Sequence, residues 1–179
     1  MSLFLATLLP GLVLAVLGAG LLVNQPALVN ALKTFPRSPT AALFFFGGGA
    51  VWFLWQVWHL STADFGEYHV LLTIGFAAVA ALAFKCVPDF LAVRGLCILM
   101  LLSAMPLLMA GYMIYDHWQI YFYKVLVYLG VVLAIWLGVQ PYRLRDFFNW
   151  LFLRPGRTRG FGGALLGYGL LLAVVAFTY

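Results

Sequence analysis

Long apolar runs separated by short polar stretches make up nearly the whole chain. Six of these runs are about 17 to 21 residues long and almost free of charged side chains, which is the length that a helix needs to cross roughly 30 Å of hydrocarbon. In lipid, backbone amides must bond within a helix or a closed barrel, and the runs lack the alternation of barrel strands. The pattern predicts six transmembrane helices, at residues 3–23, 41–60, 68–84, 95–115, 120–139 and 161–178.

The connections between these runs carry their charge unevenly. Nine of the ten Lys and Arg residues fall in the first, third and fifth connections, and Lys124 is the exception. The positive-inside rule assigns those three connections to the cytoplasm. We therefore expect one multi-pass domain, residues 1–179, in the inner (cytoplasmic) membrane, with both termini on the outer side.

Two of the cytoplasmic connections contain short amphipathic segments. Each opens with Gln-Pro and continues with four apolar residues at the spacing i, i+3, i+4 and i+7: Leu28, Ala31, Leu32 and Phe35 in the first, and Leu144, Phe147, Phe148 and Leu151 in the second. This spacing is typical of helices that lie along a membrane surface. The repeated pattern, with a shortened version at residues 87–90, also suggests a chain built as three consecutive helical hairpins.

Composition agrees with a membrane protein and excludes an ordinary soluble domain. The chain is 65% hydrophobic and 8% charged, with a mean hydropathy of +1.05, whereas soluble domains are about half apolar and about a quarter charged. The net charge of +5 is explained by membrane topology and lipid head groups, so no nucleic-acid partner is expected. Cys86 and Cys97 lie near the inner ends of two spans, which favours free thiols in a reducing compartment.

Three sequence stretches in the cytoplasmic connections show a resemblance to a protein family. The stretches FPRSPT, VPDFLAVRG and QPYRLRDFF resemble those of an uncharacterised family of bacterial six-helix membrane proteins. The resemblance implies the six-helix architecture over most of the chain. It has no function attached and supplies no catalytic or binding residue.

Polar side chains gather in the connections on the predicted outer side. The candidate metal ligands there are His59, Glu67, His69 and His117, because imidazole and carboxylate together bind divalent transition metals or relay protons. His59 and His69 end adjacent antiparallel helices, so haem ligation is a second reading. The alternative is that these residues are polar only because water reaches an interfacial loop, and we predict no cofactor from a spacing that matches no stringent signature.

A stripe on the second span is a candidate ligand groove. Gly48, Trp52 and Gln56 follow one another at helical spacing, and such a surface would suit a lipid or another elongated, neutral solute. Helix packing below a belt of interfacial aromatic residues explains the same pattern.

The sixth span carries a candidate packing face of small residues. Gly160, Gly163 and Gly167 share one face, and Gly-x-x-x-Gly lets helices approach closely, either within the bundle or between subunits. Both readings stay open at this point.

The function class depends mainly on what the sequence lacks. Every Asp, Glu, Lys, Arg and His lies within about two helical turns of a span end, whereas ion-coupled transporters place such groups near the bilayer centre. No nucleotide loop, HExxH or Ser-His-Asp order is present. We expect a non-catalytic membrane subunit that packs in a larger membrane assembly or as a homo-oligomer. A small transporter or channel for a neutral or lipidic solute, and a haem- or metal-binding redox protein, are the alternatives.

Overall fold

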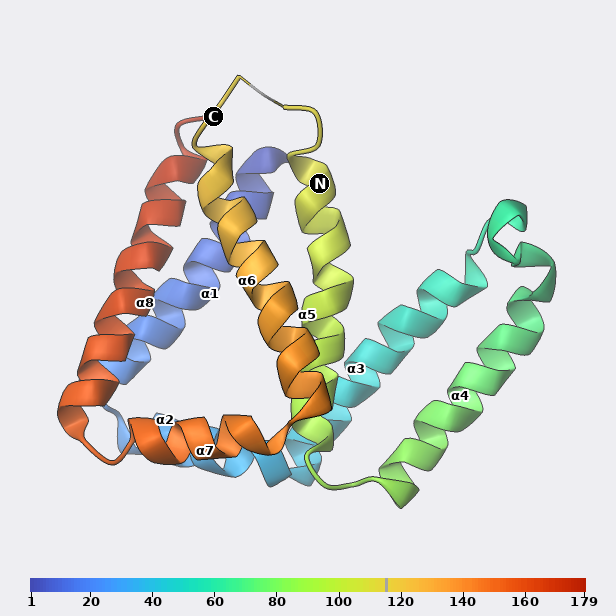
Figure 1. Cartoon of the computed structure of the whole chain (residues 1–179), viewed down its shortest axis with the longest axis horizontal. Coiled ribbons are helices and arrows are strands. Elements are labelled where there is room, and N and C mark those ends of the chain that lie inside the picture. Colours follow the sequence, from blue (N-terminus) through green and yellow to red (C-terminus); the bar gives the residue numbers. More distant parts are fainter. Residues whose placement is uncertain (115) are drawn as a thin grey trace. The chain divides into compact units, whose positions relative to one another are not determined.

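The structure is a computed structural model that describes residues 1–114 and 116–179, apart from the side chain of Thr62. Every regular element in this part of the chain is a helix. Six of them are long and apolar enough to cross a membrane (Figure 1): α1 (Leu3–Val23), α3 (Pro39–Trp58), α4 (His69–Cys86), α5 (Leu91–Ala110), α6 (Ile120–Val139) and α8 (Pro155–Ala176). The all-α membrane fold predicted from the hydropathy pattern is confirmed.

The ends of the helices follow local capping chemistry. The predicted bounds of α1 and α6 agree with the structure, whereas α3 and α8 begin earlier than predicted, at Pro39 and Pro155. Proline suits a first helical turn, because its fixed φ is helical and the missing N–H would have no partner there. At α3, the Ser38 hydroxyl also accepts a hydrogen bond from the Ala41 N–H at 3.2 Å. The two proline signals were in the sequence but lay outside the apolar runs.

The fourth span differs most from its prediction. Its helix, α5, begins at Leu91, directly after Phe90, which has a left-handed φ of 58°. It ends at Ala110, and residues 111–113 form turns that include Met113 with a φ of 59°. Tyr115, the predicted last residue of the span, lies outside the described residues. Apolar composition continued past the true end of the helix, so hydropathy alone placed that end too late.

Both short amphipathic helices are present. They are α2 (Pro26–Thr34) and α7 (Tyr142–Leu151). Short 3₁₀ turns complete the connections: η1 (Phe35–Arg37), η2 (Thr62–Asp64) and η3 (Gly66–Tyr68). Leu151 is the only buried residue in the two amphipathic helices, as expected for helices that offer their apolar faces to lipid.

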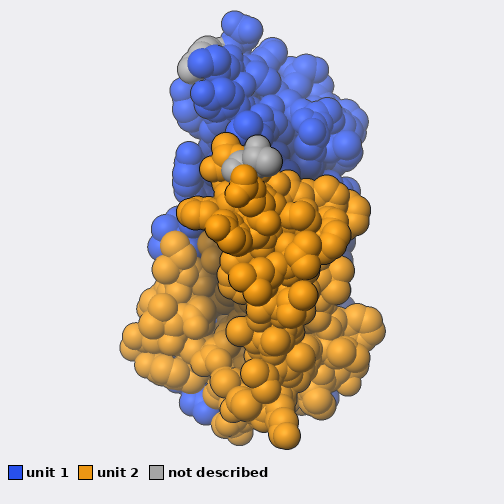
Figure 2. Space-filling view, turned by 90° about the vertical axis from the view of Figure 1, so that its right-hand side faces the viewer, with its two compact units in different colours: residues 1–33, 103–133, 145–179 blue, residues 34–102, 134–144 orange. Residues whose placement is uncertain are grey.

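The chain divides into two compact units, coloured blue and orange in Figure 2. Unit 1 comprises residues 1–33, 103–133 and 145–179, and unit 2 comprises residues 34–102 and 134–144. Both units are discontinuous in sequence. The single membrane domain expected from the sequence stays a prediction.

Unit 1 is organised by close packing of α1 against α8, the first and last helices of the chain. Two glycines on each helix face one another. A Cβ added at Gly18 would lie 2.7 Å from the Gly162 carbonyl oxygen, and one added at Gly169 would lie 2.6 Å from the Gly11 carbonyl oxygen. No side chain fits at such distances, so the two backbones touch directly.

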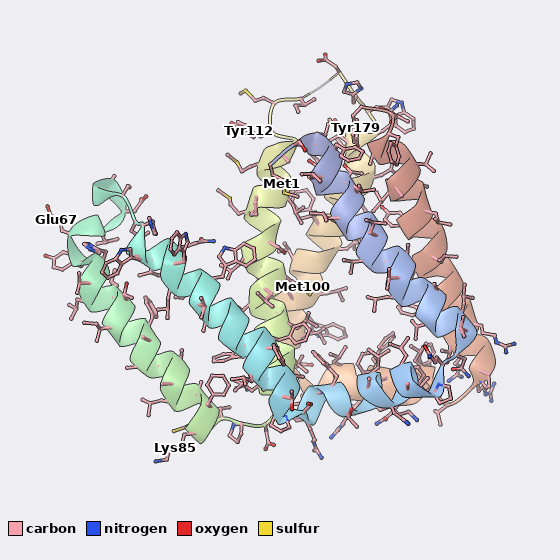
Figure 3. All side chains as sticks on the ribbon, turned by 180° about the vertical axis from the view of Figure 1, so that it is seen from behind. Met1, Glu67, Lys85, Met100, Tyr112 and Tyr179 are labelled. Carbon is pink, nitrogen blue, oxygen red and sulfur yellow. The ribbon has the colours of Figure 1, made fainter. Side chains whose placement is uncertain are left out.

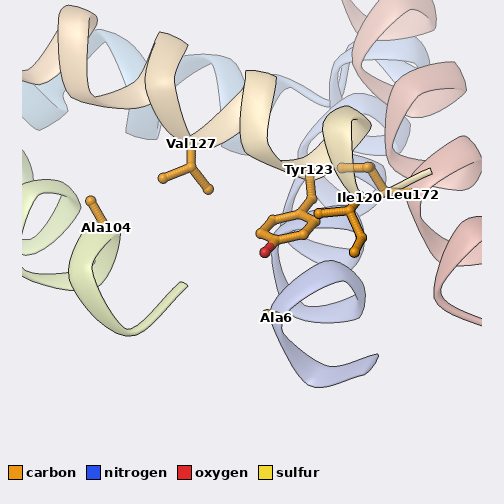
Figure 4. Close-up of a cluster of buried hydrophobic side chains, with 6 residues drawn as sticks. All are labelled: Ala6, Ala104, Ile120, Tyr123, Val127 and Leu172. Carbon is orange, nitrogen blue, oxygen red and sulfur yellow. The ribbon is translucent and has the colours of Figure 1, made fainter. Parts of the chain in front are cut away.

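The buried core of unit 1 lies beside this helix pair (Figure 4). It contains Ala6, Ala104, Ile120, Tyr123, Val127 and Leu172. A hydrogen bond of 2.8 Å from the Tyr168 hydroxyl to the Phe122 carbonyl joins α8 to α6. The two ends of the chain also meet here, because the rings of Phe4 and Phe177 pack edge to face at 5.3 Å. Thus α1, α6 and α8 share one core although they are distant in sequence.

Tyr123 brings an unpaired hydroxyl into this core. The residue is fully buried, and its Oη has no hydrogen-bond partner among the described residues. The space that the hydroxyl occupies is where a side chain of Gly111 would begin, and the Lys124 Cε lies 3.1 Å from the same point. Gly111 is therefore required by Tyr123, since any Cβ would overlap the phenol.

We expect Gly111→Ala to lower the thermal unfolding midpoint in detergent, because overpacking a tight core costs about 1–3 kcal/mol. Tyr123→Phe alone should be nearly neutral or stabilising, because it removes a hydroxyl that has no partner. The double variant should recover most of the loss. If Tyr123→Phe does not rescue Gly111→Ala, the contact between the two residues is not the cause.

Unit 2 contains a hairpin, α3 with α4, held by aromatic side chains. Three ring pairs pack edge to face along its length: Phe46 with Phe84 at 5.3 Å, Phe53 with Phe76 at 5.1 Å, and Trp58 with His69 at 5.1 Å. Such pairs add about 0.5–1.5 kcal/mol each beyond the area that they bury. Figure 3 shows Glu67 in the turn before α4 and Lys85 near the far end of that helix.

The other contact of α3 in unit 2 is with the first half of α5. A Cβ added at Gly95 would lie 2.5 Å from the Phe46 Cα, and one added at Gly49 would lie 3.0 Å from the Ile98 Cγ2. Ala42, Leu91 and Ala92 are buried near this crossing. Small residues thus let the backbones of α3 and α5 approach closely, whereas aromatic rings lie between α3 and α4.

The three consecutive hairpins predicted from the repeated pattern stay a prediction. Within unit 1, α1 packs against α8, and a hydrogen bond joins α8 to α6. Within unit 2, α3 packs against α4, and a predicted outer connection links these two helices. The repeated pattern itself corresponds to the two amphipathic helices, α2 and α7.

Candidate functional site

The histidines of the α3–α4 turn are engaged with their own backbone. The Nδ1 of His59 lies 2.8 Å from the Trp55 carbonyl oxygen, and the Nδ1 of His69 lies 2.6 Å from the Gly66 carbonyl oxygen. A carbonyl only accepts hydrogen bonds, so each Nδ1 carries the proton. The His59 ring also lies on the Trp55 ring, with centroids 4.3 Å apart. Only the Nε2 atoms of these histidines are left to bind a ligand.

The turn that carries Glu67 is shaped by Gly66. The Gly66 N–H donates to the Ser61 carbonyl at 2.8 Å, and a Cβ at Gly66 would lie 2.5 Å from that same oxygen. The Ser61 hydroxyl donates to the Asp64 carboxylate at 3.0 Å. Glu67 is exposed on the turn. The acidic residues thus belong to a tight turn that closes on itself.

His117, the remaining metal candidate, lies in unit 1. Its ring packs against the Tyr179 ring with centroids 5.6 Å apart. Among the described residues, no three His, Cys, Asp or Glu side chains are grouped so that they could hold a metal ion. The four candidates His59, Glu67, His69 and His117 therefore do not form a group of three or more metal ligands among the described residues, and metal or haem binding stays the untested alternative to a chain without a cofactor.

The candidate ligand groove is an open stripe on α3. Gly48 and Gln56 are exposed and Trp52 is half-buried. No heavy atom of the described chain comes within 4 Å of a Cβ position at Gly48. The stripe therefore offers a surface that a lipid or another helix could cover. Solute binding there stays a prediction.

The predicted glycine face of α8 is not the face that packs against α1. Gly160 and Gly167 have no described heavy atom within 4 Å of their Cβ positions, and Gly163 has only the Leu22 Cδ2 at 3.9 Å. The contact uses Gly162 and Gly169 instead. Six glycines on α8 allow several packing faces, and only the partner helix selects one of them, so packing of the predicted face against another helix of the bundle stays a prediction. Packing between subunits stays a prediction for Gly160, Gly163 and Gly167.

Sequence reasoning missed a hollow in unit 1, which we call the α2–α8 hollow. Its volume is about 250 Å³, and it is lined by Asn24, Pro26, Val29, Asn30, Phe152, Pro155 and Thr158. These residues come from the end of α1, from α2, from the connection after α7 and from the start of α8. Two similar Pro-containing junctions were visible in the sequence, but nothing in the pattern showed that they meet.

Six apolar spans with two short amphipathic helices define the class: an all-α, multi-pass membrane protein. No protein-family model, no curated protein and no solved structure matches the chain. Its function is accordingly argued from its own residues.

Proposed function

We propose that the chain is a non-catalytic integral membrane subunit that packs in, or stabilises, a larger membrane assembly. The observation that carries this proposal is the lack of burial on α4. All residues of α4 are described, and none of them is buried. Its contacts with α3 run mainly through the three ring pairs, which leave most of its circumference open.

The composition of the open surface of α4 favours a helical partner over lipid alone. Gly75, Ala78 and Ala81 are exposed, and no described heavy atom lies within 4 Å of a Cβ position at Gly75. Larger exposed side chains, Leu71 and Leu82, flank them. Small residues let helix backbones approach closely in lipid, where dispersion and not the hydrophobic effect drives association. A partner helix could therefore pack its backbone against the small residues, between the larger side chains that flank them.

The charge distribution supports an orientation within such an assembly. In the proposed arrangement, α2, α7 and the basic first turns of α8 lie at the cytoplasmic face of the inner membrane. Both termini then lie outside. Few residues remain in water on either side, which suits a subunit that acts through its spans.

Photo-crosslinking in the native membrane tests the proposal. We expect p-benzoylphenylalanine at Ala78 to give one discrete protein adduct, either a second copy or another membrane protein identified by mass spectrometry. The matched control is the same probe at Val13, an exposed position on α1, which should give lipid adducts only. Native mass spectrometry of gently extracted protein should show the same complex. A monomeric mass together with lipid adducts at both positions would overturn the proposal.

A further inference from the structure

The α2–α8 hollow has walls that the fold holds in place. The Thr158 side chain, only 1% exposed, donates to the Leu151 carbonyl at 3.0 Å and ties the first turn of α8 to the end of α7. On the opposite wall, Asn24 ends α1 in the left-handed conformation, with its N–H bonded to the Leu21 carbonyl at 3.1 Å. This turn sends the chain directly into α2. The hollow is therefore a built feature of two helix junctions.

Two basic residues lie next to lining residues of the hollow. The Lys33 Nζ lies 5.7 Å from the centroid of the Phe152 ring, which forms part of the lining. Arg154 immediately precedes Pro155 of the lining and is exposed. Arg157, in the same turn of α8, instead stacks on Trp150 at 4.6 Å. Lys33, beside the Phe152 ring, and Arg154, adjacent to Pro155 in sequence, are thus the candidate cations for a guest in the hollow.

No negative charge balances these cations at the hollow. None of the seven lining residues is acidic. Within unit 1, Asp146 accepts a hydrogen bond of 2.8 Å from its neighbour Arg145, and Asp116 belongs to the connection between α5 and α6. The first turn of α8 adds the positive end of a helix dipole at Pro155. The electrostatics therefore favour an anion.

The surroundings of the hollow identify the source of the anion. The lining combines polar groups, Asn24, Asn30 and Thr158, with apolar ones such as Val29 and Phe152. It lies where two membrane-spanning helices, α1 and α8, meet two amphipathic helices, which is the level of lipid head groups. Its volume of about 250 Å³ equals that of roughly eight water molecules at about 30 Å³ each, so it holds a head-group phosphate and its glycerol but not a whole lipid.

We propose that the α2–α8 hollow binds the phosphodiester of an anionic phospholipid, with Lys33 and Arg154 as its charged contacts. Basic pockets between spans are known to select anionic head groups. The apolar part of the lining receives the glycerol, and the acyl chains continue along the exposed apolar surface of the spans. Such a lipid would fix α2 and α7 to the ends of the helices that they join.

Native mass spectrometry of the full chain with added lipid tests this proposal. We expect the wild-type protein to retain phosphatidylglycerol in preference to phosphatidylcholine. Lys33→Gln and Arg154→Gln should each weaken retention about fivefold, and together about 25-fold, from the usual contribution of one basic side chain near a membrane surface. Lys124→Gln is the matched control, since Lys124 lies near the start of α6, beside the Tyr121 ring, and should change nothing.

A second variant separates a defined site from general attraction by positive charge. Val29→Trp fills the hollow and keeps every cation, so it should abolish retention, while the thermal unfolding midpoint measured without added lipid stays unchanged. Retention that survives Val29→Trp, or that does not distinguish the two lipids, would overturn the proposal. Millimolar inorganic phosphate bound in place of the lipid, and lost with Lys33 and Arg154, would assign the hollow to a free anion and reject the lipid.

Discussion

Valine at Gly18 or at Gly169 will disrupt the packing of α1 on α8 and destabilise unit 1. At Gly18 the added Cβ would lie 2.7 Å from a carbonyl oxygen of Gly162, and at Gly169 it would lie 2.6 Å from that of Gly11. The obstacles are backbone atoms, which cannot rotate away, so the helices must separate along the length of unit 1. We expect a loss of at least about 3 kcal/mol, the upper range for overpacked cores.

Thermal unfolding in detergent, followed by size-exclusion chromatography, measures this effect. For a chain of this size, a loss of about 3 kcal/mol lowers the midpoint by roughly 6–12 °C, and a larger loss removes the folded peak. Gly160→Val and Gly167→Val are matched controls on α8, because nothing in the described chain lies within 4 Å of either Cβ position. Equal damage from all four variants would contradict the packing seen here.

The same controls examine the surviving prediction for the other glycine face. If Gly160→Val and Gly167→Val leave the protein folded but change the mass of its complex, these glycines pack between subunits. If neither changes, the exposed glycines of α8 face lipid. The two glycine faces of one helix are thereby separated by two different readouts, stability and assembly.

The sequence predicted the long helices well because hydrocarbon imposes its length on every span. It predicted their packing poorly for a related physical reason. In water, a helix buries its apolar face and exposes its polar one, so periodicity identifies the contact surface. In lipid, the packed face and the lipid-facing face of a helix are both apolar. On α4, for example, Leu71 is exposed and Phe76 packs against Phe53. Only the partner helix shows which small residues are needed, as Gly11 and Gly18 do for Gly162 and Gly169.

The candidate sites were limited in the same way. Polar residues in a short connection are easily found, but their partners are not. In the tight turn at Gly66, the Gly66 carbonyl is hydrogen-bonded to the Nδ1 of His69. This turn depends on the left-handed conformation of Phe65, which has a φ of 63°. The residue pattern did not predict that conformation. The α2–α8 hollow depends on two junctions more than a hundred residues apart in sequence. The turn depends on local backbone conformation and the hollow depends on tertiary structure, so the pattern of apolar and polar residues predicted neither.

Alanine at Gly95 will separate α3 from α5 in unit 2. The added methyl would lie 2.5 Å from the Phe46 Cα and 2.6 Å from the Phe45 carbonyl carbon, so the α3 backbone must move by about an ångström to reach an ordinary contact distance. That shift opens the small cluster of Ala42, Leu91 and Ala92. We expect a loss of about 1–3 kcal/mol, although alanine itself is the better helix former.

Thiol labelling reports whether this separation also loosens the neighbouring buried cluster of Val93, Cys97 and Ala134. Cys97 is only 3% exposed, two residues along α5 from Gly95, whereas Cys86 is exposed and must first be changed to serine. In that background, Gly95→Ala should speed maleimide labelling of Cys97 several-fold and lower the unfolding midpoint. Gly48→Ala is the control on the facing helix, where the methyl meets no described atom and helix propensity should leave stability unchanged or slightly raised. Slow labelling in Gly95→Ala would mean that α3 moves without opening the core. Equal effects of the two variants would show that Gly48 is also covered. The stripe of Gly48, Trp52 and Gln56 on α3 would then be a contact surface.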